Sequence, residues 1–281
     1  MRLSRRCLLL LSIFLLLPGS FRAAVTPLRL DVLLSNDDGY DAPGIHALVD
    51  TLRPADRIVV AAPAREQSGK GHGLALREPI PVDEREQPDG TIWYAIDGPP
   101  ATCVRLAVES LLAWRPQVVI SGINRGDNLG VTVYHSGTVG AAREAVIAGI
   151  PAIAVSIGGN DSRDYAAAAA FVRRLIGQLV VQNELKPGLF LNVNVPAGER
   201  KGVRLTRLSV KPRHDRFERR ISPRGQLYFW ADWAPLEDDE EGTDVAAFVR
   251  GYITVTPMGL DVTSARGLET LVSALDGVWT D

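Results

Sequence analysis

Two adjacent acidic residues, Asp37 and Asp38, are the first candidates for chemistry in this chain. They follow an apolar segment, residues 30–34, that is typical of a short buried strand. In an open α/β sheet, ligands bind at the carboxyl ends of the strands. Gly39 permits a sharp bend, so both carboxylates can face one site, and paired carboxylates attract a hard cation. The alternative is an Asx turn that caps the next helix, and the motif alone favours it.

Two further polar loops follow predicted strands, so we expect them at the same edge of the sheet. The Gly-rich loop 64–73 follows a strand predicted at 57–62. The Gly/Asn/Asp-rich loop 121–130 follows a strand predicted at 117–120. Loop 64–73, taken alone, is more typical of a flexible surface loop.

The segment Ser136-Gly137-Thr138 precedes an Ala-rich helix that we expect to end near Ala148. Free backbone N–H groups, two hydroxyls and the positive end of the helix dipole suit a bound phosphate. A Ser or Thr N-cap explains the same residues equally well.

The remaining pattern predicts an α/β fold with a Rossmann-like, doubly wound and mostly parallel sheet, because strands alternate with helices. We predict further strands at 91–96, 152–156, 189–195 and 252–256, and helices at 45–52, 102–114 and 165–181. After Pro196 we expect extended segments at 203–210 and 226–230, a turn at 222–225 and a closing helix from 268. The basic stretch 211–220 can bind a phosphate or a partner subunit, or it is a solvated hairpin tip.

Composition excludes several classes of protein. A net charge of −2 over 281 residues gives no electrostatic case for binding a nucleic acid polymer or an anionic membrane. The aromatic content of 6% argues against a row of stacking platforms for nucleic acid bases. The two cysteines, Cys7 and Cys103, exclude an internal disulfide framework, since Cys7 lies in a leader.

Residues 1–24 have the pattern of a signal peptide. Arg2, Arg5 and Arg6 form a basic start, and the apolar run 7–17 is shorter than the ~20 residues of a membrane-spanning helix. The segment 4–9 also fits a twin-arginine signal. A general secretory leader and an uncleaved membrane anchor stay open as alternatives. We expect an exported, periplasmic protein with no stable membrane span after processing.

These motifs together make the chain similar to the stationary-phase survival protein (SurE) family of metal-dependent nucleotidases. The resemblance runs from about residue 30 to the C-terminus, in order and without large gaps. It is carried by Leu-Leu-Ser-Asn-Asp-Asp-Gly (33–39), Ala-Pro-Gly-Ile (42–45), Ala-Ala-Pro (61–63), Gln-Ser-Gly (67–69), Ser-Gly-Ile-Asn-Arg-Gly-Asp-Asn-Leu-Gly (121–130), His-Ser-Gly-Thr-Val (135–139), Asn-Val-Asn-Val-Pro (192–196) and Gly-Tyr-Ile-Thr-Val-Thr-Pro (251–257).

The resemblance implies a domain at 25–281, with a core at about 28–200 and an oligomerisation hairpin and tail at about 203–281. It implies a homodimer or homotetramer that hydrolyses nucleoside 5′-monophosphates, with 3′-monophosphates as a further option. One divalent cation, Mg²⁺ or Mn²⁺, is implied per subunit. Its implied ligands are Asp37, Asp38, Ser68 and Asn124, and the first two are also the implied catalytic residues. The implied substrate and phosphate contacts are Asn36, Asn128, Ser136, Gly137 and Thr138.

Several questions stay open at this stage. The nucleophile is a metal-activated water or a carboxylate, and His72 or His135 either protonates the leaving oxygen or is structural. Residues 97–103, Lys70 and His72 depart from the family pattern near the expected substrate pocket, so the base preference is undetermined.

The alternative function is an exported phospho-ligand binding protein without turnover. A carboxyl-ester hydrolase is disfavoured because the chain has no Gly-x-Ser-x-Gly elbow. Family analogy gives a cytoplasmic location as the alternative, since most relatives lack a leader.

Overall fold

The computed structural model describes residues 29–158, 164–212, 215–232, 234, 237–238, 240–275 and 278. The centre of the described structure is a nine-stranded sheet with the strand order β3-β4-β2-β1-β5-β6-β7-β11-β8. Six neighbouring strands, from β4 to β7 in this order, run parallel. The strands are β1 (Asp31–Ser35), β2 (Arg57–Pro63), β3 (Val82–Glu86), β4 (Ile92–Ile96), β5 (Val118–Arg125), β6 (Ala152–Ile157), β7 (Phe190–Val195), β8 (Val203–Leu205) and β11 (Ile253–Pro257). The predicted α/β class with a mostly parallel sheet is confirmed.

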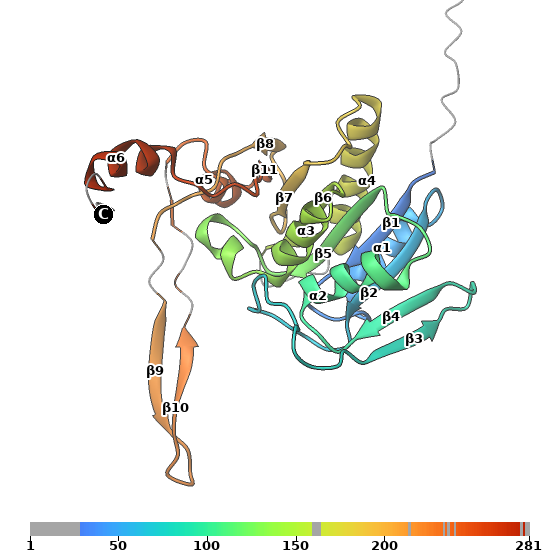
Figure 1. Cartoon of the computed structure of the whole chain (residues 1–281), viewed down its shortest axis with the longest axis horizontal. Coiled ribbons are helices and arrows are strands. Elements are labelled where there is room, and N and C mark those ends of the chain that lie inside the picture. The colour runs from blue at the N-terminus through green and yellow to red at the C-terminus, as the bar shows by residue number, and fades with distance from the viewer. Residues whose placement is uncertain are drawn as a thin grey trace, which may run out of the picture.

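Helices cover both faces of the sheet (Figure 1). Helices α1 (Pro43–Leu52) and α4 (Tyr165–Val181) share one apolar core with one face of the central strands. Helices α2 (Pro100–Leu106) and α3 (Gly137–Ile147) share a second core with the opposite face. The central strands are buried on both sides, which explains why their sequences are almost continuously apolar.

The strand order reverses between β1 and β5, and this point determines where a ligand can bind. Strand β1 pairs with β2 on one side and with β5 on the other, and both pairings are parallel. The carboxyl ends of these three strands therefore meet at one edge of the sheet, as the sequence predicted. In open α/β sheets the crevice at such a switch point is the usual ligand site.

Some predicted boundaries were wrong. Strand β5 extends to Arg125, so Asn124 lies on a strand and not in a loop, with an irregularity in its pairing to β6 between Ser121 and Asn124. Gly122 has a positive φ of 139° at this irregularity. A glycine at this position is typical of a loop, which is why the strand was predicted to end too early. The helix predicted at 102–114 is α2 followed by a π-helical turn, Ala107–Leu111. The strand β3, the 3₁₀ turn Gly130–Tyr134 and the helix α5 (Asp244–Val249) were not predicted.

The C-terminal region contains two elements that stand apart from the sheet (Figure 1). Strand β9 (Arg216–Ile221) pairs with β10 (Leu227–Asp232) as an antiparallel hairpin, and α6 (Ala265–Leu275) follows β11. The basic stretch 211–220 thus contains a strand and is not a hairpin tip. Strands β8 and β11, although they fall in the region assigned to the arm, belong to the main sheet.

Two further predictions concern the membrane and the cysteines. None of the helices in the described part of the chain is long and apolar enough to cross a membrane. The predicted signal peptide, residues 1–24, lies outside the described residues. Cys103 is buried and unpaired, and burial raises the pKa of its thiol far above the usual range.

Candidate active site

The turn after β1 is closed by Asn36. Its side-chain oxygen accepts a hydrogen bond from the Gly39 N–H at 3.1 Å, and its amide donates to the Gly39 carbonyl at 2.7 Å. Gly39 has φ of 111°, which favours glycine. The N-cap of α1 is Ala42, without a side-chain cap, and its first turn has no acidic residue. The Asx turn therefore exists, but Asn36 forms it, and neither carboxylate caps α1.

Asp37 is buried against the first turn of α3. Its side chain is 3% exposed and accepts a short hydrogen bond from the Thr138 hydroxyl. A Cβ atom on Gly137 would lie 2.9 Å from Oδ2 of Asp37, so only glycine admits the carboxylate at this place. Burial, opposed by the Thr138 hydrogen bond and aided by the charge of Asp38, raises the pKa of Asp37 to about 6.

Asp38 is held by the end of β5. Its Oδ2 accepts the backbone N–H of Arg125 at 3.0 Å. Burial raises the pKa of Asp38, the Arg125 N–H and guanidinium lower it, and the nearby Glu66 raises it again. The pair is thus fixed by two other segments of the chain, α3 and β5, in addition to its own turn.

The loop after β2 is tied to the same place. The Gln67 N–H donates to the Asp37 carbonyl at 2.8 Å, which sets Ser68 beside the acidic pair. Ser68 is exposed, and its hydroxyl donates to Glu66 at 3.0 Å. Further along, the Gly71 N–H donates to the His135 carbonyl at 3.0 Å. These bonds fix the segment from residue 67 to residue 71, so it is more than a flexible surface loop.

Asn124 immediately precedes the residue that binds Asp38. It is 9% exposed, and its amide nitrogen donates to the Gly126 carbonyl at 2.8 Å, a bond that does not use its Oδ1. Each of Ser68 and Asn124 therefore adjoins a residue hydrogen-bonded to the acidic pair. Among the described residues no three His, Cys, Asp or Glu side chains are placed so that they could hold a metal ion by themselves, so a cation here would need the hydroxyl and amide oxygens as well.

The predicted phosphate contacts lie at the N-terminus of α3. Ser136 is its N-cap and accepts the Val139 N–H at 3.1 Å, which confirms the capping interpretation. The Thr138 hydroxyl is fully buried and donates to Asp37. At the helix N-terminus the Thr138 N–H also interacts with the Asp37 carboxylate, so the Gly137 N–H is the first-turn donor that an anion can use. A direct contact between these residues and a phosphate stays a prediction.

Asn128 belongs to a buried network that the sequence analysis did not describe. Its amide donates to Ser156 Oγ at 2.8 Å, and its backbone N–H donates to Asn194 Oδ1 at 2.7 Å. Its carbonyl accepts from Asn192 and Asn194 at 2.8 and 3.0 Å. The alternating Asn-Val-Asn-Val of β7 was the available signal, because it places both asparagines on one face of the strand. This network fixes the loop that starts at Asn128. The contact between Asn128 and a substrate stays a prediction.

The two candidate proton donors differ in their surroundings. The Nε2 atom of His72 lies 2.6 Å from Oε2 of Glu144, with Arg105 3.7 Å from the other carboxylate oxygen. The His135 side chain is exposed, and its carbonyl receives the bond from loop 64–73. The pairing of His72 with Glu144 therefore favours a structural role for His72 over a role as proton donor.

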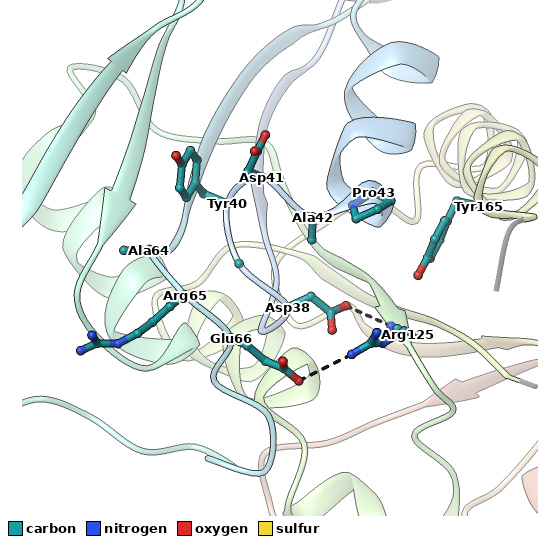
Figure 2. A pocket seen from close by; sticks show the side chains of 11 residues that line it. Asp38, Tyr40, Asp41, Ala42, Pro43, Ala64, Arg65, Glu66, Arg125 and Tyr165 are labelled. Atoms are coloured by element: carbon teal, nitrogen blue, oxygen red, sulfur yellow. Dashed lines mark hydrogen bonds and ion pairs between the residues drawn. The ribbon is translucent and has the colours of Figure 1, made fainter. Parts of the chain in front are cut away.

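A cavity of about 660 Å³ adjoins Asp38 on the side of α1 and α4 (Figure 2). Its lining includes Tyr40, Arg65, Arg125 and Tyr165, none of which was assigned a role from the sequence. The two tyrosines come from segments that lie far apart in sequence, and no local pattern links them.

Comparisons with known proteins agree with this geometry. The family model described as "Survival protein SurE" matches residues 32–215. A "5′-nucleotidase SurE" of Pelotomaculum thermopropionicum is 42% identical over 247 residues, which cover 87% of this chain and 95% of that protein. Another, of Heliobacterium modesticaldum, is 44% identical over 252 residues, covering 88% and 92%. The crystal structure of a SurE protein from Aquifex aeolicus superposes with a TM-score of 0.73 at 36% identity, covering 87% of this chain and 99% of that one. By sequence and by fold, this chain belongs to the SurE family.

Proposed function

We propose that this chain is a 5′-nucleotidase, which hydrolyses nucleoside 5′-monophosphates to a nucleoside and phosphate. The observation that carries the proposal is the pair of carboxylates at the strand-order reversal, where Asp37 is buried directly against the N-terminus of α3 and the partly buried Asp38 lies next to it. An anion site and a cation site thus adjoin each other, as phosphoryl transfer requires. The names of the relatives at 42–44% identity support the substrate.

A divalent cation fits the acidic pair. Burial and the charge of Asp38 both raise the pKa of Asp37, and the neutral Thr138 hydroxyl does not compensate a second charge beside it. Ser68 and Asn124 add oxygen donors, and an all-oxygen set suits Mg²⁺ or Mn²⁺. We assign the four residues as its ligands. When bound, the cation polarises a phosphoryl oxygen and offsets the charge that develops on it.

The chain's own groups position the substrate. The Gly137 N–H at the start of α3 donates to a phosphoryl oxygen, where the helix dipole favours negative charge. Thr138 keeps Asp37 oriented by its hydrogen bond, and the Arg125 N–H does the same for Asp38. Both carboxylates thereby keep their positions while charge moves in the substrate. Fixed groups of this kind stabilise a transition state without reorganisation.

A phosphate-release panel tests the function. The purified protein is offered nucleoside 5′- and 3′-monophosphates with added Mg²⁺ or Mn²⁺, and each reaction is repeated with a chelator. We expect release from 5′-monophosphates that the chelator abolishes and that the cation restores. Nucleotide binding without release would instead identify a binding protein, and release that resists the chelator would exclude the cation from the mechanism.

We further propose export to the periplasm and a homo-oligomeric state. The leader pattern at 1–24 supports export. The exposed apolar side chains on β9, β10 and α6 support assembly, since 48–68% of the surface of Phe217, Ile221, Leu227 and Phe229 is accessible.

A further inference from the structure

The cavity beside Asp38 is continuous with the candidate cation site, because Asp38 lines the one and belongs to the other. Its volume of about 660 Å³ falls within the range of small-molecule sites, roughly 300–1,000 Å³. A substrate whose phosphate lies between Asp38 and the N-terminus of α3 can therefore place its remaining part in this cavity. In Figure 2 the side chain of Tyr40, which belongs to the turn 38–43, lies on one side of this turn, and Tyr165 lies on the other.

The two arginines that line the cavity are each paired with a carboxylate. Arg125 lies 3.8 Å from Glu66, and Arg65 lies 2.7 Å from Asp97. A second anionic group entering the cavity would have to compete with these carboxylates for the two guanidinium groups. The charge pattern therefore suits an uncharged group.

Tyr165 provides a flat face in this cavity. It is the first residue of α4 and is partly buried against the apolar core, which holds its ring in place. Its hydroxyl points toward Arg125 and Asp38 (Figure 2). An aromatic face stacks on any nucleobase, and a fixed ring loses little conformational entropy when it does so.

We propose that this cavity is the nucleoside subsite, and that Tyr165 is the stacking platform for the base. The inference rests on the proposed nucleotidase function and extends it. It makes Tyr165 a specificity-determining residue, which favours nucleoside monophosphates over phosphate monoesters that carry a sugar without a base.

The first test is a calorimetric titration of the full chain with adenosine, which carries no phosphate. We expect Tyr165→Leu, which fills the space without a flat ring, to raise the Kd at least about fivefold, the low end of one stacking contact. Tyr165→Phe keeps the ring and should bind within about twofold of the unsubstituted protein. Tyr94→Leu, on β4 and outside the cavity, is the matched control. Undetectable adenosine binding, or equal binding by Tyr165→Leu, would overturn the proposal.

A second variant guards against misfolding of Tyr165→Leu. Ala64 lines the cavity from an exposed position, so Ala64→Phe narrows the cavity without disturbing the core. We expect it to weaken adenosine binding as well. Thermal unfolding of each variant shows whether it is folded, and normal adenosine binding by folded Ala64→Phe would also contradict the assignment.

Activity separates this inference from the proposed function. The measured quantity is the ratio of kcat/KM for adenosine 5′-monophosphate to that for ribose 5-phosphate, which has the same ester but no base. We expect Tyr165→Leu to lower this ratio at least about fivefold, through KM, and Tyr94→Leu to leave it unchanged. An unchanged ratio in Tyr165→Leu would overturn the subsite while the nucleotidase stands. If neither ester is hydrolysed but adenosine binding still depends on Tyr165, the nucleotidase fails and the subsite stands.

Discussion

Asp37 is the residue on which the proposed chemistry depends most directly. Asp37→Asn keeps the shape of the side chain but removes a charge from the cation site, so we expect turnover to fall at least ~10²-fold, the scale of one lost transition-state contact. The folded protein raises the pKa of Asp37 to about 6 from 3.8, so ionisation of this residue opposes folding. This cost is absent below pH 3.8, grows as the pH rises to about 6 and is complete above it. Asp37→Asn in chelator at pH 8 should therefore be as stable as the unsubstituted protein or more stable.

Phosphate release and thermal unfolding, each with and without Mg²⁺, measure both effects. A bound cation stabilises the folded state by mass action, so added Mg²⁺ should raise the Tm of the unsubstituted protein and raise it less in Asp37→Asn. Near-normal turnover and an equal Mg²⁺ shift in the folded variant would remove Asp37 from the site.

Gly137 tests whether the close approach of α3 to Asp37 matters. A Cβ at this position would lie 2.8 Å from Asp37 Cβ and 3.0 Å from Pro100 Cγ, so Gly137→Ala must displace one of them. We expect turnover to fall by between about tenfold and about 10²-fold, because a small displacement of a catalytic group has a cost on this scale. Gly177→Ala in α4 is the matched control, because nothing lies within 4 Å of its added Cβ. The free energy of unfolding of this control should stay unchanged or rise by roughly 0.4–1 kcal/mol. Equal activity of the two variants would show that the contact is dispensable.

At the scale of the element, α3 combines a structural cap with the proposed anion site. Ser136→Ala removes the N-cap hydrogen bond and should cost about 1 kcal/mol of folding free energy. Thr243→Ala removes the equivalent cap of α5, where Thr243 accepts the Ala246 N–H at 3.2 Å. Only the Ser136 variant should raise the KM for a nucleoside monophosphate, while its Mg²⁺ affinity stays unchanged. Denaturant unfolding and steady-state kinetics on both variants make the comparison. A similar KM for the two would mean that Ser136 is a cap and nothing more.

Most elements could be predicted from the sequence because each carries its own local pattern. Helix α4 was predicted at the residues where it lies, and β1, β2 and β6 within one or two residues, since their apolar runs are bounded by turn residues. Strand β9 was missed because Arg219 lies between Phe217 and Ile221 on the same face and interrupts the apolar alternation. The end of β5 was missed because glycine and asparagine within an irregular strand resemble a loop.

The site was predictable as a place but not as a set of contacts. Polar loops after neighbouring parallel strands must share an edge, so the meeting of three segments followed from topology alone. The bond between Thr138 and Asp37 joins residues 101 positions apart, and Tyr165 reaches the cavity from α4. Only packing in three dimensions determines such pairs, so they required the structure.

At the scale of the whole molecule, the leader predicts export. Replacement of Arg5 and Arg6 by lysine keeps the charge but removes the twin-arginine signature, so this variant should stay in the cytoplasm if that route is used. Cell fractionation with N-terminal sequencing measures the outcome, and we expect a mature start near Ala24 or Val25. Continued export of the lysine variant would leave the general secretory route. Full-length protein in the cytoplasm of cells that carry the natural sequence would end the proposal.

The hairpin of β9 and β10 determines our last prediction, which concerns assembly. A two-stranded hairpin is marginally stable alone, and its partner residues place Ile221 beside Leu227 and Phe217 beside Ala231 on one face, with Phe229 between them. Phe217 is 68% and Phe229 55% exposed, an arrangement that favours burial against a second copy of the chain. We therefore expect at least a homodimer, which the double variant Phe217→Ser, Phe229→Ser dissociates.

Sedimentation at micromolar concentration measures the mass of both proteins. Val181→Ser is the matched control, because Val181 is equally exposed, at 71%, but lies at the end of α4 in the main domain. It should leave the mass unchanged, since a single exposed apolar residue outside an apolar face contributes little to association. A fully active monomer of the natural sequence would contradict the prediction. The apolar face of the hairpin would then need another explanation, because a protein that keeps such a face in water loses the free energy that its burial would supply.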